Sequence, residues 1–157
     1  MSSIDLIAKI IGFIEDSGLV NAGVGSHLNI NKQVEMDASL LSSKGITKSI
    51  LQASVTGVNC INNPIKICKE MINLQELQFK SLIKNEMHAP NKNEMECVIA
   101  TSSGGPWLKE AGRIGSACIR GTGFDIKCSN KNQEIYMALC SEHNLMKKLA
   151  ARPLIWD

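Results

Sequence analysis

The chain contains 157 residues, of which 44% are hydrophobic and 20% are charged, and its formal net charge is +2. This length and composition are typical of one folded domain and exclude a disordered chain. The lysines are scattered and aromatic residues are few, which argues against a nucleic-acid partner. No apolar run is long enough to span a membrane, which argues against a membrane partner. The sequence also shows no signal-peptide pattern, which argues against secretion. We therefore expect one domain over residues 1–157 in an intracellular protein, either cytoplasmic or nuclear.

The N-terminal segment predicts a helix, because isoleucines recur at helical spacing over residues 4–16. Ser2 and Asp5 match a capping box at its start, and Gly18 is suited to end it. The next stretch, Gly23-Val24-Gly25-Ser26, lacks the third glycine and the lysine of phosphate-binding loops. It therefore predicts a loop that needs the backbone freedom of glycine.

Extended structure is predicted next. Residues 27–41 predict a hairpin with its turn at Asn31-Lys32, and the small and branched residues 50–58 predict another strand. Glu35 and Asp37 alternate with apolar residues, so both side chains would lie on one face. They could form a pair of acids, although a solvated strand face is the usual explanation of such a pattern.

A second helix is predicted where Asn63 can cap and Pro64 can occupy the first turn. Apolar residues from Ile65 to Ile72 recur at helical spacing, and the helix could run to Leu77 or beyond. The remaining segments predict a polar loop over residues 85–93, strands over 97–101, 114–119 and 135–140, and a helix over 142–151.

This mixture of helices and strands, without an internal repeat, predicts one layered α/β or α+β domain. The six cysteines form no CxxC pair, so we expect reduced thiols rather than a disulfide framework. Cys140 and His143 stand one helical turn apart but have no second ligand pair, so no metal site is expected. The sequence predicts no cofactor.

One stretch has the composition of a binding site. The run Thr101-Ser102-Ser103-Gly104-Gly105 follows an apolar strand, and Arg113 comes soon after it, with Gly112 and Gly115 close by. A guanidinium between glycines can approach a ligand and hold a carboxylate with two parallel hydrogen bonds. A surface arginine in a turn is the competing explanation.

Several motifs resemble plant-type asparaginases and threonine aspartase (taspase), in that family's order. They are residues 21–29 (NAGVGSHLN), 34–39 (VEMDAS), 57 with 62–65 (G and NNPI), 101–105 (TSSGG) and 112–115 (GRIG). Threonine aspartase is the nearer match, because it has the same SSGG run and also lacks the acid that asparaginases carry where this chain has Ser116. The resemblance implies an α+β fold, the αββα sandwich of N-terminal-nucleophile hydrolases, which in this chain would be a partial domain, incomplete at both ends.

The resemblance also implies roles for four residues. Arg113 would bind the side chain of a substrate aspartate, and Ser103 would support the nucleophile. Gly104 and Ser116 would line the same substrate site. The implied ligand is an Asp-containing protein or peptide, and the implied assembly is a homo- or hetero-oligomer.

The expected nucleophile is missing. Family members cut themselves before a threonine that supplies both the nucleophile and, through its freed amine, the base. Counting the family's spacing back from Ser103 leads to Asn85, with no threonine, serine or cysteine at that point. We therefore expect a truncated or degenerate threonine endopeptidase without catalytic residues. The alternatives are a non-catalytic partner or regulator of an active relative, and an isoaspartyl peptidase or L-asparaginase, which Ser116 disfavours.

Overall fold

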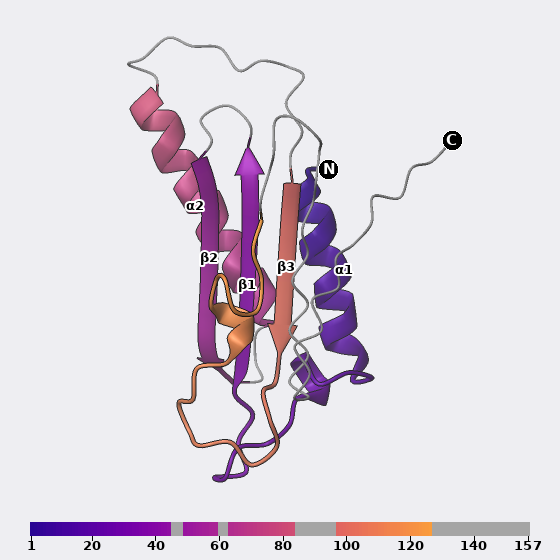
Figure 1. Ribbon diagram of the computed structural model, residues 1–157. Helices are drawn as coiled ribbons and strands as arrows, with labels where there is room; N and C mark the ends of the chain where they lie inside the picture. Colours follow the sequence, from indigo (N-terminus) through magenta and orange to yellow (C-terminus); the bar gives the residue numbers. More distant parts are fainter. Residues whose placement is uncertain (45–48, 60–62, 84–96, 127–157) are drawn as a thin grey trace, which may run out of the picture.

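Three antiparallel strands form one sheet in the order β2-β1-β3 (Figure 1). The computed structural model describes residues 1–44, 49–59, 63–83 and 97–126. In chain order the elements are α1 (Ser3–Ser17), the 3-10 turn η1 (Gly23–Gly25), β1 (Met36–Lys44), β2 (Ser49–Val58), α2 (Pro64–Ile83), β3 (Cys97–Ser103) and the 3-10 turn η2 (Ser116–Cys118). Both long helices lie on one face of the sheet, and η2 lies on the other (Figure 1).

The observed architecture is α+β, as expected. The residues described form one sheet, so the αββα sandwich remains a prediction. The expected strand over 135–140 and the expected helix over 142–151 fall outside the residues described.

Alternate residues of β1 supply two separate cores, because successive side chains of a strand point to opposite faces. Ala38 and Leu40 face the helices, and Leu41 faces the segment that follows η2. The first core also contains Ile4, Ala8, Leu51, Ala53, Ile65, Cys68 and Ile72, and the second contains Cys97, Phe124 and Ile126. The central strand is therefore covered on both faces.

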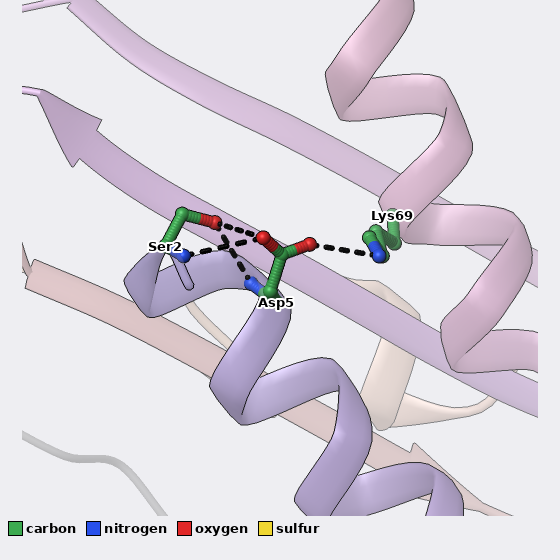
Figure 2. A network of polar contacts seen from close by, with 3 residues as sticks. All are labelled: Ser2, Asp5 and Lys69. Atoms are coloured by element: carbon green, nitrogen blue, oxygen red, sulfur yellow. Dashed lines mark hydrogen bonds and ion pairs between the residues drawn. The ribbon is translucent and has the colours of Figure 1, made fainter.

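The start of α1 is fixed by a capping box, as its sequence predicts. The Ser2 hydroxyl accepts a hydrogen bond from the Asp5 N–H at 3.1 Å, and the Ser2 N–H donates to Asp5 Oδ2 at 3.2 Å. The other oxygen of Asp5 lies 2.8 Å from Lys69 Nζ on α2 (Figure 2). The Asp5 carboxylate thus caps α1 and also links α1 to α2 through an ion pair. Gly18 ends the helix with a left-handed φ of 68°.

These contacts predict a pH dependence. Hydrogen bonds from Lys69, and then from Ser2, hold the pKa of the exposed Asp5 carboxyl well below its usual range. A lowered pKa in the folded state means that the carboxylate stabilises the fold above its unfolded pKa of about 3.9 and loses that contribution as the pH falls. We expect Asp5→Asn to be slightly less stable than wild type at neutral pH and equal to it in strong acid. Urea unfolding across this range, with the exposed Glu70→Gln as control, measures the effect; a gap that persists in strong acid would contradict it.

The extent of the predicted hairpin differs from the structure, whereas the expected reach of the second helix is confirmed. The predicted hairpin is a single bridge between Leu28 and Val34, after which β1 begins at Met36. The second helix, which was expected to reach Leu77 or beyond, extends to Ile83. No helix within the described ranges is long and apolar enough to cross a membrane.

The predicted strand over residues 114–119 is wrong. The backbone N–H of Gly115 donates to a side chain of β1, and the N–H of Cys118 donates back to the Gly115 carbonyl. Ile114 and Ile119 are 57% and 42% exposed, so the isoleucines at the two ends of the segment are not core residues of a strand. The segment turns as η2 because its donors are taken by a side chain and a local turn instead of a neighbouring strand.

Candidate functional site

The candidate site lies at the end of the sheet where β1 begins and β2 and β3 end (Figure 1). Ser103 is the last residue of β3 and pairs across the ladder with Asp37 of β1. Gly104 follows directly, and the chain then loops back to η2, which begins at Ser116. Ser103, Gly104 and Ser116 are therefore brought to one end of the sheet.

Asn21 joins the two distant glycine motifs. Its backbone carbonyl accepts from the Gly104 N–H at 2.8 Å, and its side-chain amide donates to the Gly105 carbonyl at 2.8 Å. Its side-chain oxygen accepts from the His27 N–H at 2.9 Å. All these hydrogen-bonding groups belong to one residue, so the stretch that begins at Asn21 and the stretch that follows Ser103 form one structural unit.

The glycines of this unit are required by close packing. A Cβ at Gly104 would lie 2.5 Å from both the Asn21 side-chain oxygen and the Ser26 Cβ. Gly105 has a left-handed φ of 68°, and its N–H donates to the Ser103 hydroxyl at 3.0 Å. That hydroxyl is thus an acceptor within the turn, and its own hydrogen can be given to a ligand.

Arg113 lies on the exposed loop between β3 and η2. Glu35 and Asp37 hold this loop on either side of it. Both oxygens of Glu35 accept from the Gly112 N–H, at 3.2 and 3.0 Å, and Asp37 Oδ2 accepts from the Gly115 N–H at 2.9 Å. The explanation of these acids as a solvated strand face is therefore wrong for Asp37, which is 0% exposed. Sequence reasoning missed their partners.

Within the described part of the chain, the thiol of Cys118 lies beside this cluster. Its Sγ donates to the Gly115 carbonyl at 3.0 Å. Burial, and then the neighbouring Asp37 carboxylate, raise the pKa of this thiol. A raised pKa keeps sulfur in the neutral form, which is a poor nucleophile.

Ser102 points away from the candidate site, toward α1. Its hydroxyl donates to Glu15 Oε1 at 2.5 Å, and the Glu15 side chain is 0% exposed. Of the two serines in the motif, only Ser103 is on the face of the sheet that carries Asp37. The expected nucleophile position, Asn85, and the pair Cys140 and His143 lie outside the residues described.

Glu15 gives a second pH prediction. Burial, the largest influence, raises the pKa of this carboxyl, and the Ser102 hydrogen bond only partly opposes it. A pKa raised in the folded state means that Glu15 favours folding below its unfolded pKa of about 4.3 and that this advantage is lost as the pH rises through the folded value.

We therefore expect Glu15→Gln to be more stable than wild type at neutral pH and to match it near pH 4. Thermal unfolding at a series of pH values measures the difference. Glu110→Gln, at an exposed position, is the control. A Glu15→Gln protein that is less stable at neutral pH would show that the ionised carboxylate itself stabilises this site.

Known proteins resemble the first half of this chain in sequence. The family model described as Asparaginase matches residues 1–83, which is more than half of the chain. The human isoaspartyl peptidase/L-asparaginase is 40% identical over 68 residues, covering 43% of this chain and 21% of the human protein, and the bovine protein gives the same values. The plant-type L-asparaginase of Pyrococcus horikoshii is 32% identical over 71 residues, covering 45% of this chain and 22% of its own length.

The matched region thus spans about a fifth of the length of these curated relatives. The family-model match over residues 1–83 contains Asn21, Glu35 and Asp37, which hold the segments of Gly104 and Arg113 in the structure. With the family model matching more than half of its residues, the chain belongs to the asparaginase family of N-terminal-nucleophile hydrolases.

Proposed function

We propose that this chain binds the carboxylate of aspartyl or isoaspartyl compounds through Arg113 and does not hydrolyse them. The observation that carries the proposal is the anchoring of the Arg113 loop, on both sides, to the end of the sheet where Ser103 lies. The family match supports it, because the relatives are named for isoaspartyl peptidase and asparaginase activities.

The chemistry follows from the two side chains. A guanidinium can hold a carboxylate through two parallel charge-assisted hydrogen bonds, which lysine cannot reproduce. The Ser103 hydroxyl, which already accepts from Gly105, can donate to an oxygen of the same ligand. Hydrolysis needs a nucleophile beside a base, and Asn85 at the expected position can supply neither.

Two kinds of ligand differ in whether they carry a charged α-amino group. The names of the relatives favour asparagine and isoaspartyl peptides, which carry a charged α-amino group. Ser116, which stands where asparaginases have an acid, favours an aspartate inside a peptide, as the resemblance to threonine aspartase implies. The role of a non-catalytic partner for an active relative is compatible with either ligand. We propose the peptide-internal aspartate, since a neutral serine has no charge to pair with an ammonium group.

Calorimetry on the full chain tests this proposal. The probes are an acetylated and amidated Ala-Asp-Gly peptide, a β-aspartyl dipeptide and L-asparagine. We expect the capped peptide to bind most tightly and Arg113→Lys to weaken it by about tenfold or more, because a charge-assisted bidentate pair contributes about 1.5–3 kcal/mol.

Arg120→Lys is the matched control, since Arg120 pairs with Asp125 through a single nitrogen at 3.0 Å and lysine can keep that pair. Release of ammonia or of a cleaved peptide by the wild-type chain would overturn the non-hydrolytic part of the proposal. Tighter binding of the β-aspartyl dipeptide would favour the isoaspartyl alternative. Unchanged affinity in Arg113→Lys would remove Arg113 from the site.

A further inference from the structure

We propose that Glu35 and Asp37 are positioning residues for Arg113: two carboxylates, one just before β1 and one near its start, hold the backbone amides on either side of the arginine and so fix the direction in which its guanidinium meets a ligand. The inference rests on the proposed carboxylate-binding function of Arg113. It assigns a function to two acids that act through the loop and touch no ligand themselves.

Asp37 is the more tightly held of the two acids. Its Oδ1 accepts from the Thr56 hydroxyl of β2 at 2.5 Å, and its Oδ2 accepts from the Gly115 N–H at 2.9 Å. The side chain is 0% exposed, and its backbone lies in the central strand. A buried carboxylate with both oxygens engaged is a rigid anchor, because each bond is charge-assisted and water cannot compete for it.

Gly115 lets the loop approach this anchor. A Cβ at Gly115 would lie 2.2 Å from Asp37 Oδ2, closer than any side chain could be placed. The same virtual Cβ would lie 3.8 Å from an Arg113 guanidinium nitrogen, so the arginine side chain folds back beside its own anchor. Glycine at this position is therefore explained by contact with Asp37 and proximity to Arg113.

Glu35 holds the other side of the loop. Both of its oxygens accept from the Gly112 N–H, and its backbone carbonyl accepts from Lys109 Nζ. Gly112 has a left-handed φ of 76°, so the chain reverses direction just before Arg113. The Arg113 N–H donates to the Glu110 carbonyl at 3.2 Å and closes this turn. Only Arg113 and Ile114 separate the two anchored amides.

An anchored loop raises affinity by ordering the arginine before the ligand arrives. A loose loop would have to lose its conformational freedom on binding, and that loss would weaken the complex. The acids thus increase affinity without contacting the ligand. The consequence is measurable, because removing an anchor should matter only while Arg113 is present.

Asp37→Asn and Glu35→Gln test the inference in the full chain. Each keeps the size of the side chain and removes the charge that strengthens the hydrogen bond to the loop. By amide NMR we expect faster hydrogen exchange at Gly115 in the first variant and at Gly112 in the second. We expect Asp37→Asn to lower the affinity for the capped Ala-Asp-Gly peptide by about tenfold. Glu35→Gln should lower it by less, since Glu35 is only half-buried.

The decisive measurement is a double-variant cycle with Arg113→Ala. If the acid acts through the arginine, Asp37→Asn adds no further loss of affinity once Arg113 is alanine. A loss that is the same with or without Arg113 would show a general structural role and overturn the inference. Glu110→Gln, an exposed acid on the same loop, is the control and should change neither exchange nor affinity.

Failure of a variant to fold and failure of the wild-type chain to bind can be told apart from failure of the inference. If Asp37→Asn does not fold, Thr56→Val removes one support of the same carboxylate and takes its place in the cycle. If the wild-type chain binds none of the probes, the proposed function fails. The positioning of Arg113 by the two acids is then tested by the NMR measurements alone. In that case unchanged exchange at Gly112 and Gly115, or an equally ordered Arg113 Nε–H in wild type and variants, would overturn it.

Discussion

Replacing Gly23 by alanine should lower the free energy of unfolding by about 2–5 kcal/mol. Gly23 has a φ of +59°, which is strained for any residue with a Cβ. The new methyl group would also lie 2.2 Å from the Glu15 carbonyl oxygen and 2.5 Å from the Glu15 Cα, within the backbone of α1. A helix backbone cannot give way as a flexible side chain can, so η1 or the end of α1 must shift.

Gly57 supplies a control that separates these two causes. Its φ is +68°, yet nothing lies within 4 Å of the position a Cβ would take. Gly57→Ala should therefore show the backbone strain alone, about 1–2 kcal/mol. Urea unfolding followed by circular dichroism measures both variants. Equal losses in the two proteins would mean that the contact between η1 and α1 is looser than the structure shows.

Phe124→Ala should destabilise the protein by about 3–5 kcal/mol. Phe124 is 1% exposed and packs with Leu41, Cys97 and Ile126 on the face of the sheet opposite the helices. Its removal leaves a cavity in that core, because Phe124 is the only aromatic side chain there among the residues described. Phe124 also packs the chain just beyond η2 against the sheet. Its loss should therefore make the loop that carries Arg113 less ordered.

Ile119→Ala is the matched control for this prediction. It removes apolar atoms from the same segment, but the residue is 42% exposed, so the loss should be well below that of Phe124→Ala. Denaturant unfolding gives the stabilities, and peptide affinity reports on the loop. A Phe124→Ala protein with wild-type stability would show that the second core contributes little to the fold.

Helix and strand positions were largely predictable, because they depend on local patterns. The isoleucine spacing and the Ser2–Asp5 capping box indicated α1, and Pro64 indicated the start of α2. Gln75, which interrupts the apolar spacing of α2, was not explained by sequence. Its side chain donates to the Gln52 carbonyl of β2 at 2.9 Å, a contact between elements that no local pattern contains.

The composition of the candidate site was predictable, but its supports were not. The serines, glycines and arginine were recognisable as motifs. The bond from Gly115 to Asp37 depends on the return of the chain after β3, and the two residues are 78 positions apart in the sequence. A signal for the two serines did exist, since neighbouring strand residues face opposite sides, and Ser102 does face α1. The strand over 114–119 was wrongly predicted because a short apolar segment does not show whether its backbone donors are already bonded elsewhere.

The contacts of Asn21 have a consequence for folding kinetics. The bond from its side chain to Gly105 spans 84 residues, whereas β1 and β2 are close neighbours in the sequence. Local pairings form early and long loops close late, because closing them costs more chain entropy. The β1–β2 hairpin should therefore precede the junction of the two glycine motifs. The candidate site would then form last, so a ligand that binds there would favour the completed fold and slow its unfolding.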